Sequence, residues 1–187
     1  MAGLLVATPL GLLIAMNRTA SWLIEPLIRA LRFVPLSAFI PISFLLIGTN
    51  EPQKIAVLFT TSFLYILPTT IDAARNVERN YVDVGRMCGL TTTQLTTKVI
   101  LPRISPRVLD SFRAALSIAW SYVLVVEITG ASIGIGHTMS LGQRYIQPGV
   151  VFAGVIAVST LGIVFDYSLR AASQYLFGWE QTLTMSA

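Results

Sequence analysis

The sequence is poor in charged residues, in cysteine and in histidine. Only 12% of its 187 residues are charged, whereas a soluble domain usually carries about 25%. The single cysteine, Cys88, excludes a disulfide-built module, and the single histidine, His137, argues against a Cys/His metal site. With 54% hydrophobic residues and a mean hydropathy of +0.71, the chain is not disordered. The class that remains is an all-α protein that crosses a membrane several times.

The sequence also lacks a phosphate-binding loop of the form GxxxxGK[ST]. Five membrane-spanning helices of about 20 residues would use most of the chain and leave no room for a nucleotide-binding domain. We therefore predict no ATPase or other catalytic site. An intramembrane enzyme is the competing class, but it needs a Ser/His or carboxylate pair at membrane depth, and the lone histidine lies outside the apolar runs.

The apolar runs predict a single transmembrane domain over residues 1–187. Its predicted spans are residues 3–16, 33–47, 54–71, 108–129 and 149–169. The first run is short, and we interpret it as a span and not as a signal peptide, because no basic residue precedes it. Residues 20–32, with Trp22, are typical of an amphipathic segment at the membrane interface. Residues 72–107 form the longest hydrophilic stretch and must lie outside the lipid. A glycine-rich connector that starts at residues 130–136 is expected to lead from the fourth predicted span through His137 and Arg144 to Pro148.

The distribution of basic residues predicts the topology. If residues 72–107 are cytoplasmic, eleven of the thirteen Lys and Arg residues lie on that side, and only Lys54 and Arg144 lie opposite. Cytoplasmic loops of membrane proteins carry this excess of positive charge. The net charge of +4 is therefore interpreted as topology and not as a nucleic-acid surface. The C-terminus is predicted to be cytoplasmic.

The 72–107 loop is predicted to form two short helices around a turn. Residues 81–88 have helical composition, and Gly89 can end that helix in a left-handed conformation. One of the three threonines at 91–93 can cap a second helix at about 93–100, and Pro102 is expected to end it. Such a compact projection suits insertion into a groove on another protein.

This loop resembles the "EAA" loop of permease subunits of bacterial ATP-binding-cassette (ABC) importers. That motif reads E-A-A, three residues, G, nine residues, I, one residue, then L-P, and the spacing here fits it without a gap. The matching residues are Asp83, Val84, Gly85, Gly89, Val99, Leu101 and Pro102. The departures are Asp for Glu, Val-Gly for Ala-Ala and Val for Ile, which keep an acid and an aliphatic residue.

The flanking segments resemble one subfamily, the nitrate, sulfonate, taurine and bicarbonate permeases, some of whose members serve pyrimidine-type vitamin precursors. The likeness covers roughly residues 3–170 and includes 31–55, 70–90 and 125–136. The usual chain of this family has at least one more N-terminal span, so we expect this chain to lack one. A truncated or accessory permease fragment is thus one alternative. A stand-alone secondary transporter is another, although it needs coupling acids near the midplane.

The resemblance implies a mechanism and a set of partners. Two permease subunits, identical or paralogous, form the pathway in the bacterial inner membrane. Two cytoplasmic ATPase subunits bind ATP and Mg and drive transport, and a substrate-binding protein delivers the solute. No cofactor is expected in the chain itself. In the loop, Asp83 would meet a basic residue of the ATPase, and Leu90 would bury against it.

Four residues of the fourth predicted span are candidates for the translocation path. Trp120, Ser121 and Tyr122 lie at mid-span, where packing is the alternative role. Glu127 lies near the external end, and an acid within a span is a functional candidate. The alternative for Glu127 is an interfacial carboxylate that reaches the headgroups or the region of Gly130.

Overall fold

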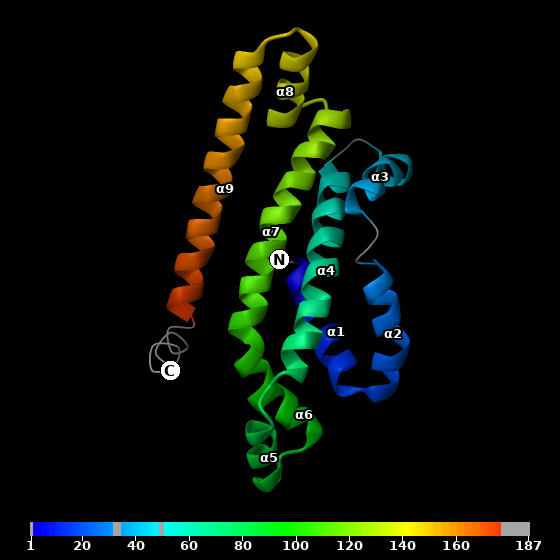
Figure 1. Cartoon of the computed structure of the whole chain (residues 1–187), viewed down its shortest axis with the longest axis vertical. Coiled ribbons are helices and arrows are strands. Elements are labelled where there is room, and N and C mark those ends of the chain that lie inside the picture. The colour runs from blue at the N-terminus through cyan, green and yellow to red at the C-terminus, as the bar shows by residue number, and fades with distance from the viewer. Residues whose placement is uncertain (1, 32–34, 49–50, 177–187) are drawn as a thin grey trace. The chain divides into compact units, whose positions relative to one another are not determined.

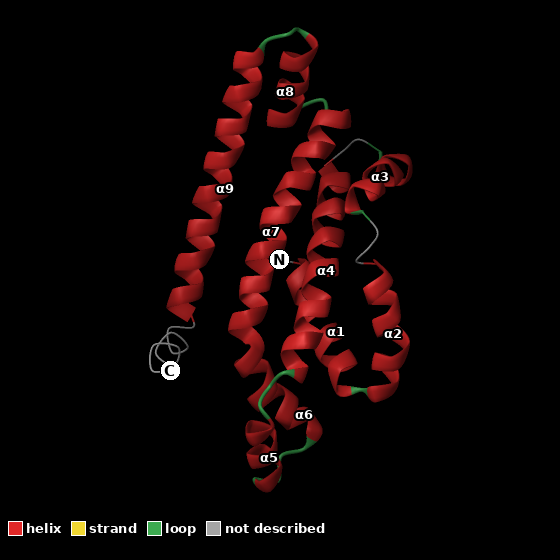
Figure 2. Cartoon of the chain, viewed as in Figure 1, coloured by secondary structure: helices red, strands yellow, loops and turns green. Residues whose placement is uncertain are grey.

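The described part of the chain is helical throughout. The structure is a computed structural model that describes residues 2–31, 35–48 and 51–176 (Figure 1). Within these ranges it contains helices and connecting loops and no strand, as the secondary-structure colouring in Figure 2 shows. This confirms the prediction of an all-α protein.

Three helical stretches of the described residues are long and apolar enough to cross a membrane. They are Glu51–Arg75, Thr92–Gly130 and Pro148–Ser173. The first is α4, the second includes α7 (Leu101–Gly130), and the third lies within α9 (Pro148–Leu176). The helix α1 (Ala2–Met16) is apolar but shorter. The three long stretches and α1 together contain or coincide with four of the five predicted spans.

The chain divides into two compact units. Of the described residues, unit 1 comprises 2–31, 62–112 and 176, and unit 2 comprises 35–48, 51–61 and 113–175.

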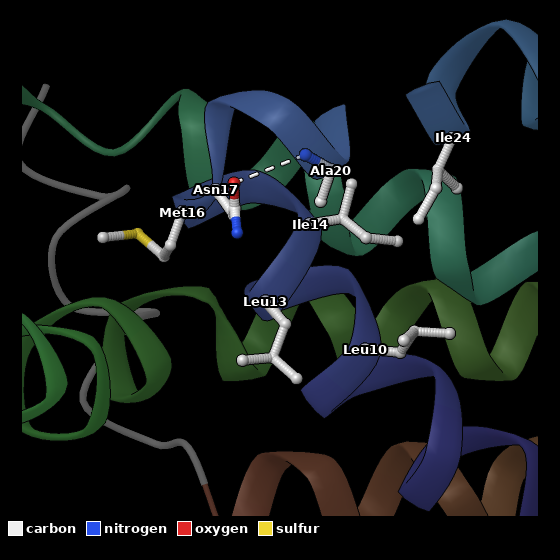
Figure 3. Close-up of a pocket in the computed structure, with 7 residues that line it drawn as sticks. All are labelled: Leu10, Leu13, Ile14, Met16, Asn17, Ala20 and Ile24. Atoms are coloured by element: carbon white, nitrogen blue, oxygen red, sulfur yellow. Dashed lines mark hydrogen bonds between the residues drawn. The ribbon is translucent and has the colours of Figure 1, made fainter. Parts of the chain in front are cut away.

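In unit 1, α1 and α2 (Arg18–Leu31) form a helical hairpin, and α2 covers most of the stretch predicted to be interfacial. Asn17 joins the two helices. Its Oδ1 accepts a hydrogen bond from the backbone N–H of Thr19 at 3.0 Å. It also accepts one from the backbone N–H of Ala20 at 3.3 Å (Figure 3). This is the bonding pattern of a helix N-cap, so Asn17 fixes where α2 begins.

Between α1 and α2 lies an open groove of about 540 Å³. Figure 3 shows the residues that line it: Leu10, Leu13, Ile14, Met16, Asn17, Ala20 and Ile24. Apart from Asn17 this lining is apolar, and it contains none of the residues predicted for the site.

The hairpin is fastened to α4 by polar and by close apolar contacts. Arg75, the last residue of α4, pairs with the Glu25 carboxylate and donates to the Ser21 hydroxyl of α2. Gly11 of α1 approaches α4 so closely that an added Cβ would lie 2.9 Å from the Cβ of Thr70. The amphipathic helix α2 therefore has one face against α4, while its Trp22 is exposed.

In unit 2, the predicted span 33–47 is only partly helical. A 3₁₀ turn at Leu36–Ala38 leads into α3 (Phe39–Ile47), and residues 33 and 34 lie outside the described residues. Nine helical residues extend about 14 Å, well short of the ~30 Å hydrocarbon core. Pro41 is tolerated because it lies in the first turn of α3, where its missing N–H has no helical partner.

The core of unit 2 is formed by α3, α4 and α7. Ile40, Val57 and Val126 are buried together, and Phe44 and Tyr122 pack against them. A short helix, α8 (Ile135–Arg144), follows α7. It replaces most of the glycine-rich connector that the sequence analysis expected to run through His137 to Arg144. The buried Gly136 explains the helix, because its missing side chain lets α8 approach α7.

Candidate functional site

The first half of the predicted loop is α5 (Arg79–Met87), which ends as the sequence predicts. Gly89 has φ +74°, the left-handed conformation that glycine adopts without strain. The N–H of Leu90 donates to the carbonyl of Gly85 at 3.1 Å, and the N–H of Gly89 donates to that of Arg86 at 2.9 Å. This pair of bonds is a Schellman motif, and it turns the chain sharply at Gly89.

The second half begins with a capping box. The Thr91 hydroxyl accepts from the N–H of Gln94, and the Gln94 side chain accepts from the N–H of Thr91 at 3.0 Å. These bonds open α6 (Thr92–Leu95), which continues as the π-helical segment Thr96–Ile100. Of the three threonines offered by the sequence, Thr91 is therefore the cap.

Pro102 does not end this helix, and that expectation was wrong. The helix runs without interruption from Thr92 to Gly130. The reason is the π-helical segment, in which the N–H of Leu101 bonds to the carbonyl of Thr96, five residues earlier. This wider turn just before the proline accommodates a residue that has no N–H and whose ring disrupts an α-helix. The loop is thus continuous with the spanning helix α7.

The two faces of α5 differ sharply. Gly85 is buried, and a Cβ added there would lie 2.5 Å from Cδ1 of Leu95. Val84 and Met87 face away and are 60% and 87% exposed. The predicted loop residues therefore divide into an inner set that holds α5 on the following helix and an outer apolar set that is open to contact.

The remaining predicted loop residues fall on both sides of this division. Leu90 and Val99 are half-buried, and their side-chain methyls lie 3.5 and 3.6 Å from the Cβ position of Gly85. Asp83 is exposed, and its carboxylate lies 3.9 Å from the Arg86 guanidinium. Leu101 is half-buried and Pro102 is exposed.

One contact in the loop was missed by the sequence analysis. The guanidinium of Arg103, in the first turn of α7, lies over the ring of Tyr81 of α5, 5.1 Å from its centroid. This distance is within the ~6 Å range of a cation–π interaction. The two residues are 22 positions apart in the sequence, and no spacing rule pairs them.

The three mid-span candidates for the path point in different directions. Trp120 stacks on Phe165 of α9, with ring centroids 6.4 Å apart. The Ser121 hydroxyl donates to the backbone carbonyl of Ser117 at 3.4 Å, and Tyr122 packs against the core of unit 2. Consecutive helical residues are about 100° apart, so these three side chains do not share one face.

Glu127 is held by both of its carboxylate oxygens. Oε1 lies 3.1 Å from Nζ of Lys54, and Oε2 accepts from the N–H of Gly136 at 3.0 Å. The Lys54 and Glu127 side chains are only 17% and 15% exposed, and Lys54 also pairs with Glu51 at 2.9 Å. In unit 2 this carboxylate therefore ties α4, α7 and α8 together.

A second ion pair joins α7 to α9. NH2 of Arg113 lies 3.0 and 3.1 Å from the two carboxylate oxygens of Asp166. Together with the Trp120–Phe165 stack, it places α9 beside α7 within unit 2. Within the described residues, the apolar helices that are long enough to cross a membrane and the hydrophilic α5–α6 loop that continues into α7 define a membrane protein.

Comparison with known proteins identifies the class. Residues 7–176 match the family described as binding-protein-dependent transport system inner membrane component. The chain belongs to this family of ABC importer permeases, which are transport proteins of the inner membrane. This confirms the family inferred from the EAA-like spacing.

The relatives agree with this assignment. A probable ABC transporter permease of Brucella abortus (strain 2308) is 31% identical over 179 residues, which are 96% of this chain and 72% of the relative. The taurine transport system permease protein TauC of Escherichia coli is 24% identical over 178 residues, 95% of this chain and 65% of that protein. A chain of the MetNI methionine ABC transporter in an inward-facing conformation shares the fold, with a TM-score of 0.73 at 20% identity. That match covers 94% of this chain and 86% of the transporter chain.

Proposed function

We propose that this permease moves a small solute and couples to a separate ATPase through α5. The observation that carries the coupling is the two-faced α5, with Gly85 packed inward and Val84 and Met87 exposed. Exposed apolar side chains on a short, firmly seated helix are suited to a groove on another protein. ATP and Mg then belong to the partner, which is expected as two copies.

The solute class is proposed from the relatives. The taurine permease matches 95% of this chain, and the flanking segments resemble permeases for sulfonates, nitrate and bicarbonate. We propose a solute of this type, delivered by a binding protein on the outer face. A second permease subunit, identical or paralogous, would complete the pathway, and the α5 side would face the cytoplasm.

Gly89 offers a direct test of the docking surface. Nothing lies within 4 Å of a Cβ added at Gly89, and its φ of +74° strains both alanine and tryptophan. Gly89→Ala and Gly89→Trp therefore both carry backbone strain and differ in bulk on the outside of the loop. In a detergent pull-down we expect Gly89→Trp to lose the ATPase that wild type and Gly89→Ala retain.

The control for folding is the thermal unfolding midpoint of the two variants, which should agree. If Gly89→Trp retained both ATPase association and substrate-stimulated ATP hydrolysis, the docking assignment would be wrong. If the wild-type chain bound no protein with a phosphate loop, the accessory-fragment or stand-alone alternatives would replace the proposal.

A further inference from the structure

If the ATPase docks on α5 as proposed above, a displacement of α5 has to reach a helix that spans the membrane, and the structure shows which contacts join α5 to that helix. Within unit 1, α5 packs on the helix that becomes α7 through Gly85 and Leu95. The second link is the cation–π contact of Tyr81 with Arg103. Tyr81 lies in the first turn of α5, and Arg103 lies in the first turn of α7.

The two links hold α5 at different points. Gly85 lies in the last turn of α5, so its contact with Leu95 alone acts as a pivot. Tyr81 lies four residues earlier, one turn away. A contact there prevents α5 from rotating about the pivot, because a helix held at two separated residues cannot turn about either one of them.

The many cations of the loop explain why the contact of Arg103 with α5 is made through an aromatic ring and not through a carboxylate. The loop is rich in cations, including Arg79, Arg86 and Lys98. Among the described residues, Arg103 has no ion-pair partner, and Tyr81 supplies its attractive contact. The face of an aromatic ring attracts a guanidinium without adding an acid that neighbouring cations would compete for.

We propose that Tyr81 and Arg103 are positioning residues that make α5 and the spanning helix α7 move as one lever. This role rests on the proposed function, since the lever is driven by the ATPase that docks on α5. Without the contact α5 remains folded and able to dock, but part of its displacement is lost before it reaches α7.

The first experiment measures the link itself, in the full chain in nanodiscs. Spin labels are placed at the native Cys88 and at Arg107→Cys, both exposed in the structure, and their distance distribution is recorded by pulsed EPR. In Tyr81→Leu we expect part of the population to move from the wild-type distance to longer or more broadly spread distances. The ratio of the first population to the second should fall about two- to fivefold. Tyr81→Phe keeps the ring and should retain the wild-type distribution. Arg103→Met should match Tyr81→Leu, and the double variant should show no further loss.

The second experiment measures transmission in the complex with the ATPase. A label at Arg107→Cys, in a Cys88→Ser background, reports the movement of α7 when ATP and vanadate are added. We expect the change in the label's EPR signal on addition of ATP and vanadate to be about two- to fivefold smaller in Tyr81→Leu than in wild type. In Tyr81→Phe this change should equal that of wild type, and both variants should still co-purify with the ATPase. A contact that only stabilised the fold would not alter this change in chains that remain assembled.

Three results would overturn the inference. One is a wild-type distance distribution in Tyr81→Leu, and another is an equal loss in Tyr81→Phe, which would assign the effect to the hydroxyl. Either leaves the proposed function intact, because ATPase association is measured separately. The third is a wild-type chain that binds no ATPase, which removes the proposed function and the lever with it.

Discussion

At the residue scale, glycines in this protein perform two different tasks. Gly89 supplies a backbone conformation and has open space around it, whereas Gly136 supplies room. A Cβ at Gly136 would lie 2.6 Å from the Cβ of Glu127 and 2.9 Å from the backbone carbonyl of Leu124. Neither of these atoms can move aside without shifting α7.

Gly136→Ala is therefore expected to destabilise the protein by about 1–3 kcal/mol through overpacking. The matched control is Gly149→Ala, because nothing lies within 4 Å of its Cβ position near the start of α9. The control should change the stability by less than about 0.5 kcal/mol or raise it slightly. Thermal unfolding in detergent compares the two, and equal midpoints would contradict the close packing of α8 on α7.

Thr91 carries a prediction for local stability in the loop. Thr91→Ala removes the hydroxyl that caps α6, at a cost of about 1 kcal/mol. Thr91→Ser keeps an equivalent acceptor and serves as the control. Hydrogen exchange at the amides of residues 93–96 should be faster in the alanine variant by roughly fivefold. Unchanged exchange would mean that the cap does not hold this helix.

At the element scale, ion pairs join helices that apolar patterning alone leaves unspecified. Lys54 and Glu127 connect α4 to α7, and Arg113 and Asp166 connect α7 to α9. Arg75 and Glu25 connect α4 to α2 within unit 1. Apolar side chains gain little from each other in lipid, so polar contacts of this kind specify which helices meet.

The Lys54–Glu127 pair is suited to a double-mutant cycle. Glu127→Ala leaves the Gly136 N–H without its acceptor, so we expect a loss of about 1.5–3 kcal/mol. Lys54→Met removes the charge but keeps the length of the side chain. The double variant should be more stable than the sum of the single effects implies, by about 0.5–3 kcal/mol. Additive unfolding free energies would show that the two side chains do not interact.

At the scale of the whole molecule, the topology is the main prediction left for experiment. Cys88 is the only cysteine and is exposed at the end of α5. If the loop is cytoplasmic, a membrane-impermeant maleimide should label Cys88 in inside-out vesicles and not in intact cells. Ile146→Cys in a Cys88→Ser background should give the opposite pattern, because Ile146 follows α8 at the other end of α7 and is exposed. Labelling of Cys88 from outside the cell would reverse the proposed orientation.

Much of the helical architecture follows from local patterns. The apolar runs predicted the long helices, and the spacing around Gly89 predicted the turn and the family. Two local expectations failed for reasons that lie outside the local pattern. Pro102 was expected to stop a helix, and the π-helical segment before it allows the helix to continue. The stretch after Gly130 was expected to be a connector, and Gly136 allows it to pack as α8.

The sequence by itself determined the class of protein, the long helices and the position of the loop, because length, hydropathy and motif spacing are properties of neighbouring residues. Tertiary structure decided which side chains meet. Glu127 was assigned to the translocation path or the interface, and its Lys54 partner lies 73 residues away. No local pattern distinguishes Tyr81, whose ring lies under the Arg103 guanidinium in the folded chain. Such pairs arise when helices that are separate in the sequence pack together, and no periodicity within one helix records its partner.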